Sequence, residues 1–378
     1  MIADALRLRI IGQGPVALAL LLFARRAGIP AASIDIDPPL NPGLTVSPSL
    51  ARRTLALSLG SWQLLGRIIE LPRACPIYKV EVSLQGRAGR SRFTSTDMGT
   101  AALGYVTDYQ SVQQALINAV TSGATSAVAA LSNSPQTYQS DIRSQVPTII
   151  IHAEGNAGDE ADVREFSQHA VLANLFCPQQ PAHCALERFT PDGPLALLPM
   201  AESGHFSLVW CCSADAALRR TNIAEAEFLD ELRVKSGSRL VGARLASPRS
   251  QSPLQRRQRK QTQAGLEVWI GNAAQALHPV AGQGLNLGLR DSFELAQWLA
   301  RLALQRPLAD ATQIEQSLKN FVDLRRPDRR QTILLTDTLA SVFTKTWMSP
   351  AQSLALSVLD LTPGLRQRFA GRLMFGQR

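Results

Sequence analysis

The sequence has few of the residues that build metal centres and disulfide frameworks. Its 378 residues include five cysteines and five histidines, and they contain no CxxC, HxxxH or HExxH pattern. The cysteine number is odd and no pair has zinc-ligand spacing, which argues against a disulfide scaffold, a zinc site and a metal hydrolase. Free thiols fit a reducing cytoplasm, so we expect a cytoplasmic protein without a metal.

Long apolar runs are also absent. The nearest candidate, residues 16–24, is about half of the roughly 18 residues that a membrane-spanning helix needs. Arg7 and Arg9 before this run imitate the start of a signal peptide, but the glycine pair and the strand-like alternation around it argue against one. The composition, 45% hydrophobic and 18% charged, is that of a folded globular chain, and the length suggests two domains or one domain with an inserted layer.

The net charge of +9 is concentrated in two segments. Residues 249–260 carry five Lys/Arg and no acid, and residues 321–378 carry nine Lys/Arg and four acids. The rest of the chain is close to neutral, and no aromatic residues interleave the first cluster, which argues against a nucleic-acid binder. Both clusters are hypothesised to face an anionic lipid surface or an acidic partner, with a solvated basic face as the alternative.

A glycine-rich turn lies between two predicted strands near the N-terminus. Residues 6–11 (LRLRII) have the pattern of a short buried strand, and the apolar helical stretch after the turn ends at Gly28. A second strand is expected over residues 33–37. This order of strand, turn, helix and strand is the context of the G-x-G-x-x-G/A fingerprint that binds dinucleotides.

Each position of this fingerprint has a physical task. Gly12 permits the tight turn, Gly14 lets the backbone approach a pyrophosphate, and Ala17 is small enough for close helix–strand packing. The helix N-terminus offers unpaired N–H groups and its positive dipole end to the phosphates. Asp35 lies 23 residues after Gly12, where a carboxylate can bind ribose hydroxyls. The pattern does not separate NAD from FAD, and the alternative is a glycine-rich turn that binds nothing.

A second glycine motif follows a predicted strand at residues 266–271. It contains a Gly-Asn pair, which suits a ribityl chain and a pyrophosphate, and a Gly-Gln-Gly turn before a helix, which makes a second anion site for the N1/O2 edge of a flavin. His278 could be a base, but a packing role is favoured because flavin chemistry needs no protein base there. The predicted cofactor-binding residues of this motif are Gly271, Asn272, Pro279, Gly282, Gln283, Gly284 and Asn286.

Residues 271–291 resemble the GD-x-A-H-x-x-x-P-x-x-G-Q-G-x-N motif of the class A flavoprotein monooxygenases, the para-hydroxybenzoate hydroxylase-like family. More narrowly, they are similar to the ubiquinone-biosynthesis hydroxylases, in particular the 2-polyprenyl-6-methoxyphenol hydroxylases. Residues 187–200 (ERFTPDGPLALLPM) and 207–211 match segments of the same proteins, as does the stretch 328–337. Arg53 matches the family arginine near the cofactor. The resemblance covers nearly the whole chain.

The resemblance implies an α/β fold with a para-hydroxybenzoate hydroxylase-like, Rossmann-type FAD-binding domain, an interleaved antiparallel-sheet substrate domain and C-terminal helices. Alternating runs at residues 195–199 and 206–212 support strands in the substrate domain. A Pro363-Gly364 break is expected within the C-terminal helices. The expected FAD-binding domain covers residues 1–72, 100–172 and 264–345, the substrate domain 73–99 and 173–263, and the helical segment 346–378.

The chain departs from the family pattern at its middle motif. Glu154-Gly155 replaces the usual Asp-Gly, and no S-x-x-R follows at the usual distance. Glu154 and Gly155 are still expected to contact the cofactor, but the longer side chain changes the geometry of the nicotinamide step, and no residue is assigned to NAD(P)H. Asn272 and Gln275 replace an acid and a histidine of the broader family, as in the ubiquinone subgroup.

The mechanism implied by the resemblance needs no catalytic triad or metal. In that family NAD(P)H reduces FAD, O2 adds at flavin C4a to give a hydroperoxide, and the distal oxygen is transferred to an electron-rich phenol, here a polyprenylated phenol of ubiquinone biosynthesis. No catalytic residue is assigned, and Glu187 is either a salt-bridge partner of Arg188 or a substrate residue. The alternative is a flavin-binding scaffold within a ubiquinone-biosynthesis assembly. In either case the protein could associate peripherally with the inner face of the membrane.

Overall fold

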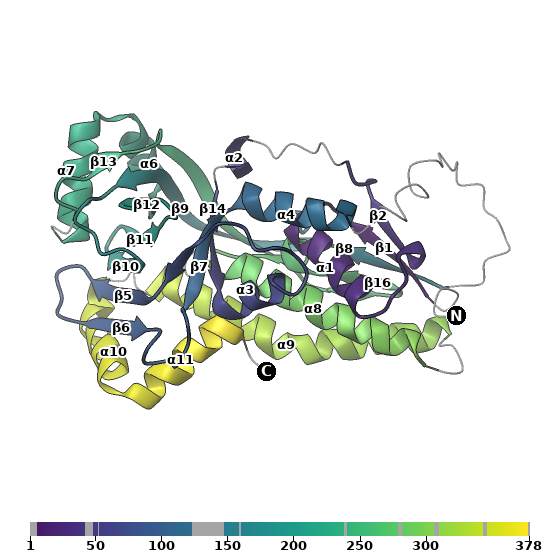
Figure 1. Cartoon of the computed structure of the whole chain (residues 1–378). Helices are drawn as coiled ribbons and strands as arrows, with labels where there is room; N and C mark the ends of the chain where they lie inside the picture. The colour runs from purple at the N-terminus through teal and green to yellow at the C-terminus, as the bar shows by residue number, and fades with distance from the viewer. Residues whose placement is uncertain are drawn as a thin grey trace.

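The computed structural model describes residues 6–41, 48–51, 53–122, 147–158, 160–237, 240–278, 282–305, 310–342 and 346–376. Pro279 lies outside this described part. The molecule is elongated, with a helix-covered sheet at each end and a small sheet between them (Figure 1). This is the mixed α/β architecture that the sequence predicted.

The first sheet contains the N-terminal strand and is mostly parallel. Its order is β15 (Gln263–Ala264), β16 (Glu267–Trp269), β8 (Thr148–His152), β1 (Arg7–Ile11) and β2 (Ile34–Asp37). Alternate residues of β1 and β8 are fully buried, because the sheet is covered by α1 (Pro15–Arg26) and α8 (Gln283–Ala303). The strand, helix and strand expected over residues 6–37 are therefore present.

Helices α1 and α8 pack closely because two glycines leave room for one valine. A Cβ on Gly271 would lie 2.9 Å from Val16 Cγ1, and one on Gly288 would lie 2.7 Å from Val16 Cγ2. Gly271 begins the short 3-10 helix η2 (Gly271–Ala273) with φ of +58°. The first turn of α1 is thus held against η2 and the middle of α8.

The second sheet lies at the other end of the molecule and is mainly antiparallel (Figure 1). It is called the substrate sheet below, because most of it falls in the expected substrate domain. Helices α6 (Ala214–Asn222) and α7 (Glu225–Ser236) cover one of its faces, where Trp210, Phe228 and Leu232 are fully buried. Its order is β17 (Gln275–Ala276), β14 (Ser250–Arg259), β9 (Ala161–Phe176), β12 (His205–Ser213), β11 (Gly193–Pro199), β10 (Cys184–Thr190), β5 (Lys79–Leu84) and β6 (Arg90–Thr94), with β13 (Arg244–Leu245) beside β9.

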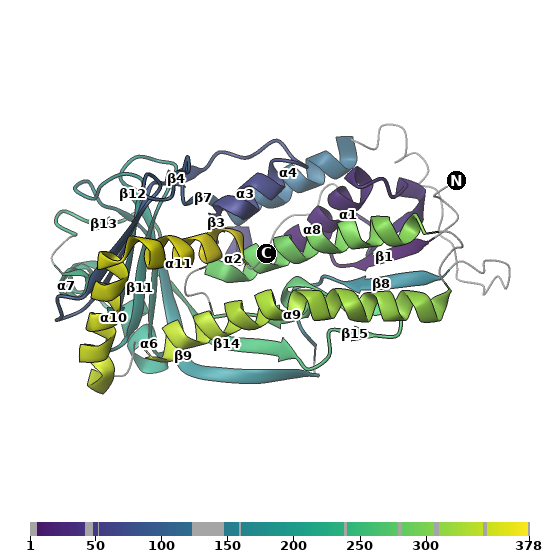
Figure 2. The same ribbon diagram turned by 90° about the horizontal axis from the view of Figure 1, so that it is seen from below.

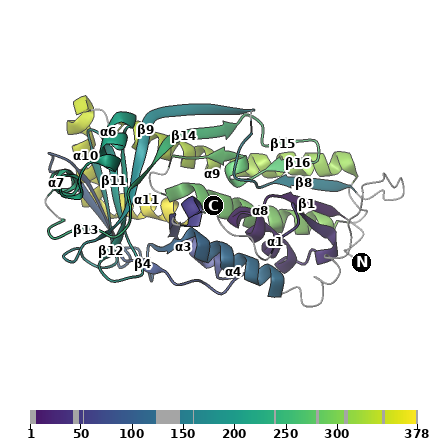
Figure 3. The same cartoon turned by 90° about the horizontal axis from the view of Figure 1, so that it is seen from above.

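Two long strands connect the ends of the molecule. β9 and β14 run from the substrate sheet toward the first sheet (Figure 2), so residues 161–172 belong to a strand of the substrate sheet. The small sheet between them comprises β3 (Thr54–Ser58), β7 (Gly104–Asp108) and β4 (Cys75–Ile77), with α3 (Leu59–Leu65) and α4 (Tyr109–Ser122) beside it. Helix α4 also packs along α1, on the side of α1 away from α8 (Figure 3). The chain therefore passes between the sheets several times.

The C-terminal region is helical and contains a buried charge network. Arg290 Nε lies 3.0 Å from Asp328 Oδ2, and Arg325 binds Asp291 at 2.9 Å and Asp328 at 2.6 Å. This network joins α8 to α9 (Ala311–Val342), and it gives the family-like residues around 290 and 325–330 a structural role.

Two further helices complete the chain. α10 (Ser349–Leu361) and α11 (Pro363–Phe375) meet at the expected Pro363-Gly364 break. Short elements are η1 (Ala31–Ser33), α2 (Pro48–Ala51) and η4 (Thr346–Met348). Among the described residues, no helix is long and apolar enough to cross a membrane.

Candidate functional site

The first glycine turn joins the ends of three strands. Gly12 has φ of +115°, and its N–H donates to the carbonyl of Asp37 at 2.8 Å. A Cβ at Gly12 would lie 2.8 Å from Glu154 N and 2.9 Å from the backbone of Ala153. Both the backbone conformation and the space therefore require glycine here. The turn after β1 is consequently fixed between the ends of β2 and β8.

The N-terminus of α1 is open in front of this turn. Gly14 is its N-cap, no side chain caps the helix, and its first turn contains no acid. The nearest atom to a Cβ at Gly14 would be Tyr109 Oη at 3.8 Å, and Ala17 is fully buried behind it. An uncapped helix N-terminus with an unobstructed backbone is suited to bind a phosphate.

Two buried oxygens beside this turn lack donors among the described residues. Gln113 is 2% exposed, and its Nε2 donates to the carbonyl of Gln13 at 2.5 Å while its Oε1 has no partner. Glu154 Oε2 is likewise buried without a partner. Unpaired buried acceptors are costly, and the hydroxyls of a ribose or ribityl chain are donors. The residues present therefore fit the dinucleotide-like half of FAD.

The acid at the end of β2 is Asp37. It lies beside Gly12 and is ion-paired with Arg9, whereas Asp35 lies two residues earlier in the strand and is exposed. A count of residues from Gly12 selects Asp35, but η1 lengthens the connection after α1 and moves the strand end to Asp37. The sequence feature that selects Asp37 is its place as the last residue of the predicted strand, whereas the residue count from Gly12 selects Asp35.

Arg53 and Tyr109 meet near the same helix terminus. The Tyr109 N–H donates to the carbonyl of Arg53 at 2.9 Å. Burial raises the pKa of Tyr109, while the positive charge of Arg53 opposes that rise. Arg53 is exposed, as a residue that contacts a ligand would be in its free form. Sequence reasoning proposed Arg53 but did not select Tyr109 or Gln113, because α4 carries no motif of its own.

Glu154 is held by a histidine at the end of β8. His152 Nδ1 lies 3.3 Å from Glu154 Oε1, and its Nε2 lies 2.9 Å from Glu267 Oε2. Burial alone would lower the pKa of His152, but the two carboxylates raise it above its ordinary value. Burial would raise the pKa of Glu154, and the bond from His152 brings it below its ordinary value. Gly155 faces open space.

The second glycine turn is anchored to β3. Gly282 is the N-cap of α8 with φ of +58°, and a Cβ there would lie 3.2 Å from Ala56 Cβ. Asn286 accepts from Ser58 N at 2.9 Å and donates to the carbonyls of Ala56 at 3.1 Å and Gly282 at 2.8 Å. The side chain of Asn286 therefore fixes the start of the helix on β3.

The anion-binding face of this second turn is formed by backbone. A Cβ at Gly284 would have no atom within 4 Å, and Gln283 beside it is buried. Gly284 lies one helical turn before Gly288, which contacts the start of α1 through Val16, so the two open helix N-termini are close together. Both helix N-termini are therefore available to one extended ligand.

The remaining predicted residues differ in their surroundings. Asn272 is exposed after β16, and the space beside Gly271 is filled by Val16. His278 is 1% exposed and packs edge-on against Phe166 at 4.9 Å. Burial lowers the pKa of His278 to about 4, so the imidazole is neutral at pH 7. A packing role agrees with these observations.

The chain is similar to known flavoproteins over most of its length. Residues 69–307 match the family model described as FAD binding domain. The chain is 28% identical to "Ubiquinone hydroxylase UbiL" of Rhodospirillum rubrum, covering 90% of this chain and 82% of that protein. It is 28% identical to "3-demethoxyubiquinol 3-hydroxylase" of Escherichia coli, covering 75% and 76%.

A solved structure supports the same fold. Klebsiella pneumoniae HpxO complexed with FAD and uric acid has a TM-score of 0.64 at 13% identity, covering 98% of this chain and 97% of that one. The family match spans more than half of the chain, and the two open helix N-termini with their buried acceptors fit FAD. Use of NAD(P)H as reductant is typical of this family. The chain therefore belongs to the FAD binding domain family, has the para-hydroxybenzoate hydroxylase-like fold and is an FAD-dependent monooxygenase.

Proposed function

We propose that this protein hydroxylates the aromatic ring of a polyprenylated phenol in ubiquinone biosynthesis, using FAD, NAD(P)H and O2. The observation that carries the proposal is the likeness to two proteins named as ubiquinone-pathway hydroxylases, which covers 90% and 75% of this chain. Bound FAD supplies the oxygen-transfer chemistry, and the protein supplies binding, orientation and exclusion of water.

The dinucleotide half of the cofactor is assigned to the first turn. The α1 N-terminus at Gly14 binds the pyrophosphate, and Gln113 and Glu154 accept hydrogen bonds from sugar hydroxyls. Asp37 is the acid best placed for the ribose, because it ends β2 beside Gly12. These assignments follow from the positive dipole end of the helix and from the unpaired acceptors around it.

The flavin half is assigned to the second turn. Backbone N–H groups at Gly284 and its neighbours would bind the N1/O2 edge, where negative charge develops on reduction. Asn272 and Pro279 remain proposed contacts of the same region. We also retain the proposed division into an FAD-binding domain (1–72, 100–172 and 264–345) and a substrate domain (73–99 and 173–263), except that residues 161–172 lie in β9 of the substrate sheet.

A scaffold function is the second candidate, and Glu154 is the observation that favours it. The carboxylate that replaces the family aspartate is bound by His152 at 3.3 Å, so one of its oxygens is already engaged. If this arrangement disables the nicotinamide step, the purified protein will retain FAD tightly but will not oxidise NADH or NADPH, even with partner proteins present.

Peripheral association with an anionic membrane is part of the proposal. Exposed apolar side chains gather near the basic C-terminal segment, where Trp347, Leu354 and Leu361 are 77%, 65% and 80% exposed. Apolar side chains near basic ones suit the surface of an anionic bilayer. Flotation with liposomes that contain anionic lipid, but not with neutral liposomes, is expected. Equal flotation with both would remove the electrostatic part of this proposal.

Hydroxylation is tested directly with the purified FAD-loaded protein. We expect NADH- or NADPH-dependent addition of one oxygen atom to a short prenylphenol such as 2-farnesylphenol, detected by mass spectrometry. Deletion of the gene should cause an unhydroxylated quinone precursor to accumulate, which would identify the physiological substrate. A correctly folded, FAD-loaded protein that hydroxylates no prenylphenol would contradict the proposed activity.

A further inference from the structure

The substrate sheet contains a carboxyl group with one buried oxygen that has no partner in the described part of the chain. Glu187 lies in the middle of β10 and is half-buried, and its Oε1 atom is buried without a hydrogen-bond donor. Desolvation raises the pKa of Glu187 to about 7. An unpaired carboxylate oxygen away from water is costly, and a hydrogen-bond donor on a ligand would satisfy it.

Glu187 faces away from helices α6 and α7. Its neighbour Leu186 belongs to the core beneath these helices, and Arg188 donates to the carbonyl of Lys235 at 2.9 Å and to Ser83 Oγ at 3.1 Å. Adjacent strand residues point to opposite faces of a sheet. The salt bridge considered between Glu187 and Arg188 is therefore not formed, and Glu187 lies on the opposite face.

That opposite face is directed toward the cofactor-binding half of the molecule. Ala185, two residues before Glu187, packs against β4 and β7 of the small sheet, and β7 pairs with β3, which anchors the start of α8. Phe189, two residues after it, belongs to a cluster that includes Phe166. Phe166 in turn contacts His278 in the second glycine motif. Glu187 thus lies between two segments that border the flavin-binding turn.

The surface around Glu187 on this face is apolar. Ala196 of β11 lies opposite Glu187 in the register, and Val209 of β12 lies opposite Ala196. Cys211 is close enough that the charge of Glu187 adds to the effect of burial in raising the pKa of its thiol. One carboxyl group with apolar neighbours on the adjacent strands matches an aromatic ring that carries one hydroxyl.

We propose that Glu187 binds the phenolic hydroxyl of the substrate and takes its proton during hydroxylation. This role rests on the proposed function, since it requires a phenol as substrate. The carboxylate accepts the O–H proton, so the phenol becomes a phenolate and the carboxylate becomes a carboxylic acid. One atom of O2 is transferred to the ring and the other leaves as water, with the two electrons of NAD(P)H and a solvent proton supplied through the bound cofactor. When the ring becomes aromatic again, the ring-carbon proton leaves to water and Glu187 returns its proton to the oxygen.

The physical advantage lies in the electron density of the ring. A phenolate donates more strongly than a phenol to the carbons ortho and para to its oxygen, which are the positions that an electrophilic oxygen attacks. A free phenol of the tyrosine type has a pKa of about 10, so little of it is ionised at neutral pH without a base. A positioned base contributes roughly 100-fold or more to such a step.

The test compares Glu187→Gln with the wild-type FAD-loaded protein. The variant should keep its FAD and its rate of flavin reduction by NAD(P)H, because the residue is not assigned to cofactor binding. Hydroxylation of 2-farnesylphenol should fall about 100-fold, with hydrogen peroxide released instead. The wild-type hydroxylation rate should rise with pH through an apparent pKa near that of Glu187, and the variant should lack this limb. Glu187→Asp should recover part of the rate.

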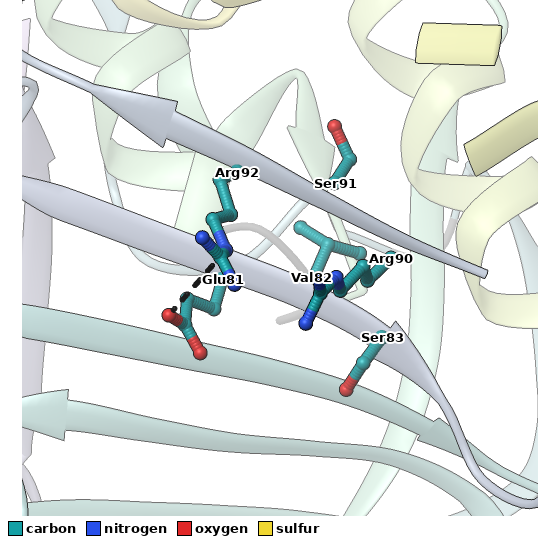
Figure 4. Close-up of a pocket in the computed structure, with 6 residues that line it drawn as sticks. All are labelled: Glu81, Val82, Ser83, Arg90, Ser91 and Arg92. Carbon is teal, nitrogen blue, oxygen red and sulfur yellow. Dashed lines mark ion pairs between the residues drawn. The ribbon is translucent and has the colours of Figure 1, made fainter. Parts of the chain in front are cut away.

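Glu81 provides a matched control on the same sheet. It lies on β5 opposite Leu186 in the register, and therefore on the face away from Glu187. Figure 4 shows Glu81 directed to the side opposite Ser91, in a small hollow between β5 and β6 that contains no residue of the glycine turns. Glu81→Gln removes a carboxylate that already has a partner in Lys79. Its hydroxylation rate and pH profile should match the wild type.

A binding measurement separates this inference from the proposed function. Titration of the oxidised, FAD-loaded protein with 2-farnesylphenol and with its O-methyl ether is followed by the change in flavin absorbance. The wild type should bind the phenol at least about tenfold more tightly, and Glu187→Gln should remove this preference. Equal binding of both compounds by the wild type, or an unchanged preference in the variant, would overturn the role of Glu187 whether or not turnover occurs. Failure of wild-type turnover with the preference intact would instead refute the proposed reaction.

Discussion

Replacing Glu187 with glutamine should make the protein more stable at alkaline pH while it impairs hydroxylation. The carboxyl group has a pKa of about 7 in the folded protein against an ordinary value of 4.5. Because the folded-state pKa is raised, the stability associated with this group is fully present below pH 4.5 and is lost as the pH rises through about 7. Glutamine has nearly the same shape and carries no charge, so it avoids this loss.

The magnitude follows from the difference in pKa. Each pKa unit corresponds to about 1.4 kcal/mol, so ionisation of the buried carboxyl at pH 8 reduces the free energy of unfolding by about 3 kcal/mol. Glu187→Gln should recover this amount at pH 8 and less than about 1 kcal/mol at pH 5. For a chain of this length, about 3 kcal/mol corresponds to a rise of about 4 °C in the thermal midpoint.

The assay is thermal unfolding of both proteins at pH 5 and pH 8 with the same saturating concentration of FAD, since bound ligand shifts the midpoint. The quantity to compare is the thermal midpoint of the variant minus that of the wild type, taken at each pH. Any effect of the amide that does not depend on pH cancels when the two differences are compared. Glu81→Gln should show no gain at pH 8. If Glu187→Gln lowers the midpoint equally at both pH values, the carboxylate is paired or solvated and the reasoning fails.

The other predictions concern the glycine turn, its anchor and two charge clusters. Gly284→Val should lose FAD while the protein stays folded, since a side chain there would occupy the open anion site; Gly364→Val, at an equally open position in α11, should retain FAD. Normal FAD content in Gly284→Val would show that the flavin does not bind at this turn. Asn286→Ala breaks three hydrogen bonds, one buried and two partly buried, and should lower the free energy of unfolding by about 2–3 kcal/mol in urea titrations. A loss below about 0.5 kcal/mol would show that α8 is anchored elsewhere. Asp328→Asn leaves the buried Arg290 without its carboxylate, while Arg325 keeps its ion pair with Asp291, and should cost about 3–5 kcal/mol by the same measurement. An unchanged midpoint would refute the network. Because the pKa of His152 is raised in the folded protein, its contact with two carboxylates stabilises the fold fully below its unfolded-state pKa. This stability is lost as the pH rises through the higher folded-state pKa, and the thermal midpoint of His152→Gln should lack the decline. Parallel pH profiles of variant and wild type would exclude this role of His152.

Much of the fold could be predicted because its decisive features are local. The turn at Gly12 and Gly14 follows a strand of alternating burial and precedes a helix that is apolar on nearly all sides. The second turn before α8 has the same kind of local pattern, as do the strands β11 and β12 and the break at Pro363. Each of these depends on neighbours within a few residues of the chain, so the elements could be predicted locally, whereas the fold class was implied by the family resemblance.

The residues of the site were less predictable, because their partners come from distant segments. Asn286 was expected to contact the cofactor, but 228 residues separate it from Ser58, whose N–H occupies its oxygen. Gly271 was assigned to the cofactor for its sequence pattern, and the structure fills its space with Val16. Gln113 carried no signal at all until α4 was placed beside the first turn.

The two glycine turns predicted a dinucleotide-type cofactor from the sequence alone, and the resemblance of residues 271–291 to the class A flavoprotein monooxygenases implied the flavoprotein type. Local pattern fixes backbone conformation, and both turns depend on backbone N–H groups, so their function could be seen without a fold. Tertiary structure decided which acid ends β2, which amide is free for a ligand, and which face of the substrate sheet carries Glu187. Burial and hydrogen bonding belong to pairs of residues brought together by folding, and they determine whether a side chain stabilises the protein or remains available for chemistry.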